Sequence, residues 1–105
     1  MQQTTARDLH ARIQADDRPL LLDVREPWEL AICRIDGAEL MPMSQIVRRL
    51  GELDPKRETV VVCHHGIRSQ QVALYLEHQG FERIINLQGG VAAWARDVDP
   101  GMPTY

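Results

Sequence analysis

The chain has 105 residues, of which 44% are hydrophobic and 26% are charged, and its formal net charge is −3. This size and composition predict one domain, residues 1–105, with its own hydrophobic core, and the lack of a basic field argues against nucleic acid as a partner. No apolar run approaches the ~18 residues of a membrane span, and the first residues lack the basic and apolar regions of a signal peptide. We therefore expect a cytoplasmic protein without a membrane partner.

The first forty residues predict one helix and two strands. Thr5 is a suitable N-cap residue, and apolar residues recur after it at helical spacing, so a helix is expected over residues 6–15. Residues 20–24 form a short, nearly continuous apolar run, which is typical of a strand covered on both faces of a sheet. Residues 38–41 are a weaker strand candidate.

The middle of the chain contains the clearest signals. Ser44 can cap a helix that should end before the Asp54-Pro55 pair. Residues 59–63 are mostly β-branched and apolar, and they predict a central strand. A helix follows and should end just before Gly80, which stands where a left-handed residue closes a Schellman motif.

The last part of the chain predicts a strand over residues 83–87 and a helix over residues 91–95. Strands that alternate with helices favour right-handed crossovers and a parallel sheet. The expected fold is therefore an α/β domain with a central parallel β-sheet and helices on both faces. In such a fold the ligand lies beyond the carboxyl ends of the strands.

Cys63 stands at that end of the strongest predicted strand, and residues 64–69 connect it to the clearest helix. A short loop that enters a helix can point backbone N–H groups and the positive end of the helix dipole at an anion, and a thiolate is such an anion. Gly66 allows the backbone to turn around the sulfur, and Arg68 adds a positive charge that favours the thiolate. These residues suggest a nucleophilic cysteine, and a buried strand residue is the equally weighted alternative from composition alone.

Three separated segments resemble the rhodanese family. Residues 22–29, Leu-Asp-Val-Arg-Glu-Pro-Trp-Glu, are similar to its N-terminal signature, and residues 63–69, Cys-His-His-Gly-Ile-Arg-Ser, look like its active-site loop. Residues 87–94, Leu-Gln-Gly-Gly-Val-Ala-Ala-Trp, resemble its C-terminal signature, and residues 101–103 match a common ending. The family fold is an α/β domain with a central parallel sheet, in agreement with the fold expected from periodicity.

The resemblance implies a thiosulfate sulfurtransferase without a cofactor. Its catalytic residue, Cys63, attacks the outer sulfur of a small anionic donor such as thiosulfate and carries that sulfur as a persulfide. Cyanide accepts the sulfur in the test tube, and a thiol or a protein cysteine is the expected acceptor in the cell. The substrate-binding residues implied by the resemblance are His64, His65, Gly66, Ile67, Arg68 and Ser69.

Some residues near these motifs have open roles. Where family members usually carry glycine and histidine, this chain has Cys33 and Arg34. A small residue that fills a small site is the simpler interpretation of Cys33, and a second redox thiol is the alternative. Asp23 and Arg25 end a strand on the same side of the sheet as the nucleophile, and they can either support the site or form a structural ion pair.

The adjacent histidines His64 and His65 do not predict a metal site. They point in different directions, and no second spaced pair of cysteine or histidine ligands completes a zinc set. We expect them to line the mouth of the loop, where partial protonation can attract an anionic donor.

Two alternative functions stay open. A cysteine phosphatase or arsenate reductase also uses a thiolate in a loop that ends in arginine, but with five intervening residues. Here four residues separate Cys63 from Arg68, and the smaller ring suits a single sulfur atom better. The other alternative is a persulfide carrier or a regulatory rhodanese-like module. Regulatory modules commonly lack the cysteine, whereas a carrier needs the same residues as the enzyme.

Overall fold

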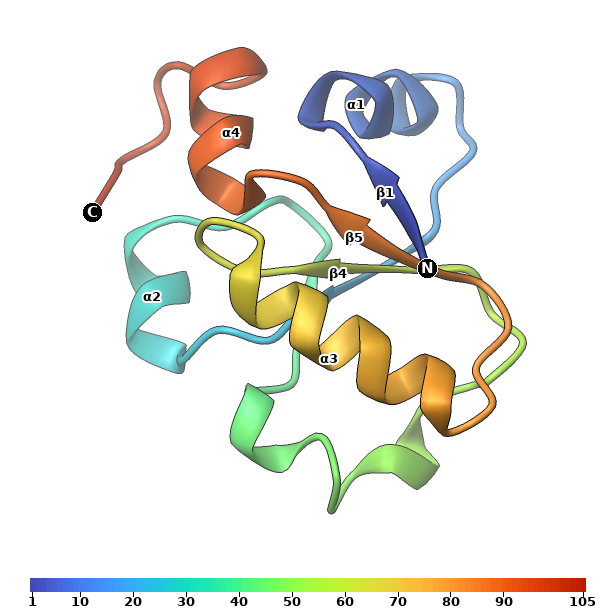
Figure 1. Cartoon of the computed structure of the whole chain (residues 1–105). Coiled ribbons are helices and arrows are strands. Elements are labelled where there is room, and N and C mark those ends of the chain that lie inside the picture. The colour runs from blue at the N-terminus through green and yellow to red at the C-terminus, as the bar shows by residue number, and fades with distance from the viewer.

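In the computed structural model, which describes all 105 residues, strands and helices alternate along the chain (Figure 1). The elements in order are β1 (Gln2–Thr4), α1 (Ala6–Gln14), β2 (Leu20–Asp23), α2 (Pro27–Ile32), β3 (Glu39–Leu40), the 3₁₀ turns η1 (Met43–Gln45) and η2 (Leu50–Glu52), β4 (Thr59–Val62), α3 (Ile67–His78), β5 (Ile84–Leu87) and α4 (Gly90–Asp97). All strand pairs are parallel, and the order across the sheet is β1-β5-β4-β2-β3. The expected α/β fold with a central parallel sheet is therefore confirmed.

β4 is the middle strand of the sheet, and its sequence suits that position. All of its residues, Thr59–Val62, are buried, and it pairs with β5 on one side and β2 on the other. β-branched side chains fit a pleated surface that is covered on both faces. Cys63 comes directly after β4, so it lies at the centre of the carboxyl edge of the sheet, where α/β proteins bind ligands.

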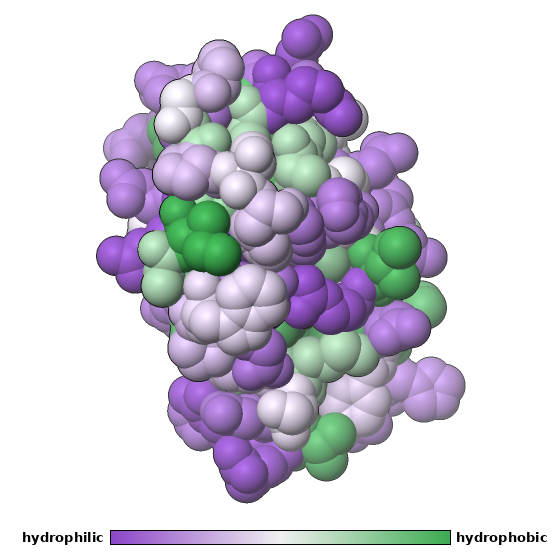
Figure 2. Space-filling model, turned by 90° about the vertical axis from the view of Figure 1, so that its left-hand side faces the viewer, coloured by the Kyte–Doolittle hydropathy of each residue, from purple (hydrophilic) through white to green (hydrophobic).

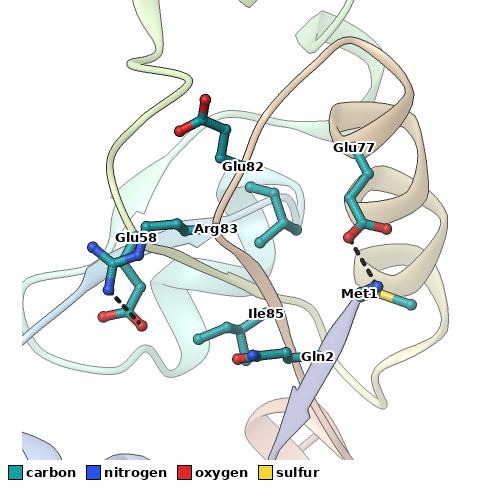
Figure 3. A pocket seen from close by; sticks show the side chains of 8 residues that line it. Met1, Gln2, Glu58, Glu77, Glu82, Arg83 and Ile85 are labelled. Carbon is teal, nitrogen blue, oxygen red and sulfur yellow. Dashed lines mark ion pairs between the residues drawn. The ribbon is translucent and has the colours of Figure 1, made fainter.

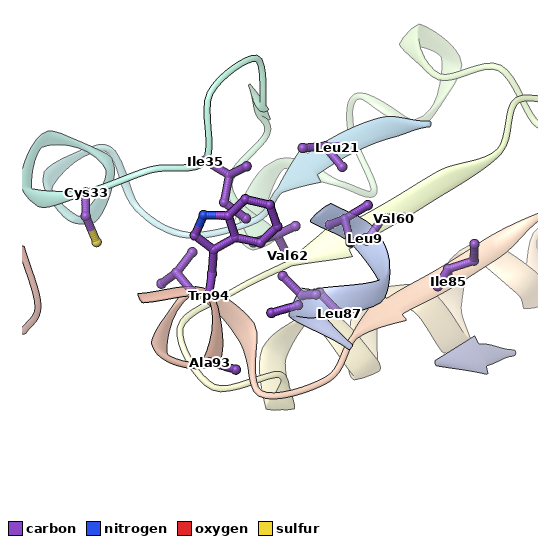
Figure 4. Packing of buried hydrophobic residues seen from close by; sticks show 12 residues of the cluster. Leu9, Leu21, Cys33, Ile35, Val60, Val62, Ile85, Leu87, Ala93 and Trp94 are labelled. Atoms are coloured by element: carbon purple, nitrogen blue, oxygen red, sulfur yellow. The ribbon is translucent and has the colours of Figure 1, made fainter. Parts of the chain in front are cut away.

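Side chains that alternate along the strands form two separate cores, one on each face of the sheet. α1 and α4 cover one face, and α3 covers the other (Figure 1). The core under α1 and α4 contains Val62, Trp94 and Cys33 (Figure 4). The core under α3 contains Leu76 and Cys63. The two cysteines therefore lie on opposite faces of the sheet.

Most of the predicted elements are present. The apolar runs form β2, β3, β4 and β5, and α1 is capped by Thr5, whose side chain accepts a backbone hydrogen bond in the first turn. α3 ends in the expected Schellman motif. Gly80 has φ +92°, its N–H donates to the Glu77 carbonyl, and the Phe81 N–H donates to the Leu76 carbonyl.

The helix predicted from Ser44 is wrong. The segment forms two separate 3₁₀ turns, and neither turn has a side-chain capping hydrogen bond. Ile46 is the one buried residue among residues 43–53. Gly51 costs a helix about 1 kcal/mol relative to alanine. A segment with so little buried apolar surface lacks the packing that stabilises most helices in proteins.

Two elements have no counterpart in the sequence-based prediction. β1 is a three-residue strand at the edge of the sheet, where it pairs with β5. α2 begins with a capping box, in which the side chains of Glu26 and Glu29 each accept a backbone hydrogen bond from the other residue, and Pro27 stands in its first turn. The Glu-Pro-x-Glu pattern that produces this helix start is visible in the sequence.

The amino edge of the sheet, opposite Cys63, is held by ion pairs around a surface hollow (Figure 3). The Met1 ammonium group lies 2.8 Å from the Glu77 carboxylate, and Arg83 lies 3.4 Å from Glu58. These pairs tie the start of β1 to α3 and the residues before β5 to those before β4. Glu77 and Glu58 therefore have a structural role in this hollow.

The face that carries α2 and the last residues of the chain is mostly hydrophilic, with isolated hydrophobic residues (Figure 2). Four large apolar side chains of the protein are more than half exposed, and they belong to α2, to the segment between η1 and η2, and to α3: Trp28, Val47, Ile67 and Leu74. None of the helices has the length and apolar character needed to cross a membrane.

Candidate active site

Cys63 is the residue around which the site is built. It is 1% exposed, and its Sγ accepts a hydrogen bond from the Gly66 N–H at 3.1 Å. Its thiol donates to the Ser69 hydroxyl oxygen at 3.3 Å. The N–H groups of Ile67, Arg68 and Ser69 begin α3 and have no acceptor inside that helix, as at every helix N-terminus. The sulfur therefore lies beside the positive end of a helix dipole.

Two glycines allow the loop to fold tightly around the sulfur. Gly66 has φ +94°, a conformation that other residues rarely adopt. Gly90, at the start of α4, has φ +59°, and a Cβ atom there would lie 2.3 Å from the Cys63 carbonyl oxygen and 2.5 Å from that of His64. The same two carbonyl groups accept hydrogen bonds from the first turn of α4 at 2.9 and 3.0 Å. The loop is thus fastened to α4 as well as to α3.

Asn86 connects the loop to the sheet. It is 2% exposed and lies in β5. Its Nδ2 donates to the Gly66 carbonyl at 3.3 Å and to the Gln3 side chain at 2.9 Å, and its Oδ1 accepts a hydrogen bond from the Ser69 hydroxyl. Sequence reasoning missed Asn86, although a single polar residue in the buried run Ile84–Leu87 is a visible signal.

Arg68 is paired with Glu29 and is not a free positive charge beside the sulfur. Its two terminal nitrogens donate to the Glu29 carboxylate at 2.8 and 2.7 Å. These hydrogen bonds lower the pKa of Glu29 from 4.5 to about 2, against the opposing effect of burial. Glu29 is 3% exposed, and sequence reasoning did not identify it. A capping residue of α2 therefore holds the arginine of the loop.

Asp23 and Arg25 form a fully buried ion pair, with Arg25 Nη2 2.8 Å from an Asp23 oxygen. Arg25 also donates to the Cys33 carbonyl at 2.9 Å and to the Tyr105 hydroxyl at 3.0 Å. Neither residue has a hydrogen bond to the loop that holds Cys63. These contacts favour the structural role among the two that the sequence left open.

Aromatic rings cover the start of the loop. The His64 ring stacks on the Tyr105 ring at 3.9 Å between centroids and on the His65 ring at the same separation. The expectation that the two adjacent histidines point in different directions is therefore wrong, because both rings join one aromatic stack. Trp28 packs edge-on against Tyr105 at 5.7 Å. Burial lowers the pKa of His64 below 6.5, which disfavours the partial positive charge expected at the loop mouth.

The predicted substrate-binding residues fall into three groups, of which the first, His64 and Arg68, is half-buried and is held by Tyr105 and Glu29. Gly66 and Ser69 contact the sulfur, whereas His65 and Ile67 are exposed at the surface, Ile67 to 70%. No three histidine, cysteine, aspartate or glutamate side chains come together in a way that could hold a metal ion.

Comparisons with known proteins agree with this geometry. A model of the Rhodanese-like domain family matches residues 5–97. A protein of Allochromatium vinosum named Sulfurtransferase is 41% identical over 88 residues, which cover 84% of this chain and 82% of that protein. Rhodanese-like/PpiC domain-containing protein 12, chloroplastic, of Arabidopsis thaliana is 38% identical over 105 aligned residues, which cover 93% of this chain but only 35% of that protein.

A solved structure is similar over nearly the whole chain. The crystal structure of a rhodanese-like domain protein from Staphylococcus aureus has a TM-score of 0.84 and 32% sequence identity, and the match covers 90% of this chain and 91% of that chain. The chain therefore belongs to the rhodanese-like family, as its three sequence signatures indicated. Within that family it is similar, over most of both lengths, to the Allochromatium and Staphylococcus proteins.

Proposed function

We propose that this protein is a sulfurtransferase that takes the outer sulfur of thiosulfate and passes it to a thiol, with Cys63 as nucleophile and persulfide carrier. The observation that carries the proposal is the contact of Cys63 Sγ with the Gly66 N–H at 3.1 Å, beside the N-terminus of α3. An N–H donor and a helix dipole both stabilise an anionic sulfur. The relative from Allochromatium that is named Sulfurtransferase supports the same chemistry.

In the first half-reaction the Cys63 thiolate attacks the outer sulfur of thiosulfate. A new S–S bond forms, the S–S bond of thiosulfate breaks, and sulfite leaves with the electron pair. The product is a Cys63 persulfide whose outer sulfur is anionic. The Ser69 hydroxyl accepts the thiol hydrogen and donates its own hydrogen to Asn86 in the structure. Once the thiol proton has left, this hydroxyl can rotate away from Asn86 and donate a hydrogen bond to the thiolate.

In the second half-reaction an acceptor thiolate attacks the outer sulfur of the persulfide. The acceptor becomes a persulfide, and Cys63 leaves as a thiolate that the Gly66 N–H stabilises. Cyanide can replace the thiol, and the product is then thiocyanate. His65 in the loop and Ile67 at the start of α3 are exposed, so these two predicted substrate-binding residues should meet the donor and the acceptor first.

The pairing of Arg68 disfavours a phosphatase or an arsenate reductase. Such an enzyme needs the arginine to hold a tetrahedral oxyanion, ideally through two parallel hydrogen bonds. Here both terminal nitrogens of Arg68 already bind Glu29. The four-residue spacing between Cys63 and Arg68 argues in the same direction, because the ring is smaller.

Intact-mass measurement after incubation with thiosulfate tests the proposal. The parent protein should gain the mass of one sulfur atom, and cyanide should remove it with formation of thiocyanate. Cys63→Ser should abolish both steps, whereas Cys33→Ser is the matched control and should retain them, because Cys33 lies on the other face of the sheet. The proposal fails if Cys63→Ser forms thiocyanate at the parent rate.

The number of turnovers separates an enzyme from a carrier. A sulfurtransferase should form many equivalents of thiocyanate per protein from thiosulfate and cyanide. A carrier should release one equivalent after loading by a partner protein and should not be reloaded by thiosulfate alone.

A further inference from the structure

The Tyr105 hydroxyl joins two buried charged groups that come from different parts of the chain. It accepts a hydrogen bond from Arg25 at 3.0 Å and donates one to the Glu29 carboxylate at 2.8 Å. Glu29 in turn holds Arg68, the second residue of α3. One hydroxyl group therefore links the end of β2, the helix α2 and the N-terminus of α3.

The Tyr105 ring holds the other side of the same loop. It lies nearly parallel to the His64 ring, with 3.9 Å between centroids and 19° between planes. Trp28 of α2 supports it edge-on at 5.7 Å. His64 is the residue directly after Cys63, so Tyr105 contacts the loop immediately after the sulfur and, through Glu29, at the point where α3 begins.

We propose that Tyr105 is a positioning residue for the Cys63 loop, through the stack of its ring on His64 and through the link of its hydroxyl to Glu29 and Arg68. The expected effect on the reaction rate rests on the proposed sulfur transfer, whereas the expected effect on the position of the loop is independent of it. The Tyr105 side chain fixes the two ends of the loop relative to each other. The Gly66 N–H, which lies between these ends, is thereby kept within hydrogen-bond distance of the sulfur.

The charge state of His64 offers a readout that a general loss of stability would not change. The titratable and charged groups near this ring are His65 in the loop, Tyr105, Glu29 of α2, Arg25 after β2 and Arg68 of α3. Burial is the main reason that the pKa of His64 lies below 6.5. Removal of the Tyr105 ring should expose His64 to water and let its pKa return toward the ordinary value.

Three variants of the full chain test the two parts of the proposal. Tyr105→Leu removes the ring and the hydroxyl, and Tyr105→Phe removes the hydroxyl alone. Thr104→Ala is the matched control, because Thr104 is exposed on the same segment. Two quantities are measured for each, the titration midpoint of the His64 ring by NMR and the single-turnover rate of persulfide formation at saturating thiosulfate.

Tyr105→Leu should raise the His64 midpoint and slow persulfide formation by about tenfold, which is a loss on the order of one well-made hydrogen bond to a charged group. Tyr105→Phe should keep the parent midpoint and slow the reaction by roughly threefold. Thr104→Ala should match the parent in both measurements.

The outcomes decide each part separately. If Tyr105→Leu leaves the His64 midpoint at the parent value, the stacking role is wrong. If Tyr105→Phe reacts at the parent rate, the hydroxyl link does not position the loop. This second variant preserves the ring and its packing, so it decides the hydroxyl role even where the leucine variant does not fold. If the parent forms no persulfide from thiosulfate, the proposed function fails, while the His64 titration still judges the stacking role.

Discussion

Glu29→Gln should destabilise the protein through the loss of one buried charge. The Glu29 carboxylate accepts hydrogen bonds from Arg68 at 2.7 and 2.8 Å, from the Tyr105 hydroxyl at 2.8 Å and from the Glu26 N–H at 2.8 Å. Glutamine has nearly the same shape, but it replaces one acceptor oxygen by an NH₂ donor and leaves Arg68 without a counter-charge. Removal of one partner of a buried ion pair is more costly than removal of an exposed one.

The shifted pKa of Glu29 sets the size of the effect. It falls from 4.5 to about 2, mainly through the hydrogen bonds from Arg68. A shift of this size corresponds to roughly 3 kcal/mol of stability at neutral pH. Because the Arg68 side chain is 36% exposed, screening by water reduces the expected value to about 2 kcal/mol. The pKa is lower in the folded state, so this contribution is complete above pH 4.5 and is lost as the pH falls through about 2.

Urea unfolding at about pH 7.5 and about pH 3.5 measures both the size and the pH dependence. Glu29→Gln should be less stable than the parent by about 2 kcal/mol at the higher pH, and the difference should shrink by roughly 40% at the lower pH. Glu52→Gln is the matched control, because Glu52 also accepts two hydrogen bonds from an arginine, Arg49, but at the surface. It should leave the urea midpoint unchanged. A Glu29→Gln protein as stable as the control, or a difference independent of pH, would refute the reasoning.

Three further outcomes are expected. Gly90→Ala should lower the melting temperature by about 10 °C or more, because the new Cβ atom would lie 2.3 Å from the Cys63 carbonyl oxygen. Gly51→Ala is the control and should keep the parent melting temperature, because no atom lies within 4 Å of its new Cβ; equal melting temperatures of the two variants would contradict this. Asn86→Asp places a negative charge beside the Ser69 hydroxyl that contacts the thiol, so the pH midpoint of single-turnover persulfide formation should rise, and an unchanged midpoint would count against the role of Asn86. The parent should hydrolyse no aryl phosphate under conditions where it transfers sulfur, and phosphatase activity that is lost with Cys63→Ser would reverse the assignment.

The elements that could be predicted from the sequence are those in which several local signals agree. β4 combines β-branched residues with a continuous apolar run, and α3 combines a helical pattern with Gly80 at its end. β1 carries no such signal, because its three residues are held by their pairing with β5, more than eighty positions later. The helix expected from Ser44 shows the reverse case, in which a suitable capping residue is present but too little apolar surface follows it.

The candidate site divides in the same way. Cys63, Gly66 and Ser69 lie within one short segment, so their spacing reveals them and the structure shows their contacts. Glu29 and Tyr105 act on that segment from distant parts of the chain. Glu29 lies 39 positions before Arg68, and Tyr105 lies 76 positions after Glu29. Nothing in the local sequence indicates that a capping glutamate will bind the arginine of a loop so far along the chain.

The contacts that hold the loop join parts of the chain that are synthesised at different times. Asn86 binds Gln3, which lies 83 residues earlier, and Tyr105 binds a residue 80 positions earlier. Residues 84–105 supply Asn86, the first turn of α4 and Tyr105, all of which fasten the loop. We therefore expect the loop to take its native form only after residues 84–105 have been synthesised and have docked on the sheet. Until then the groups that surround the Cys63 sulfur are not all in place, so the candidate site should form late in folding.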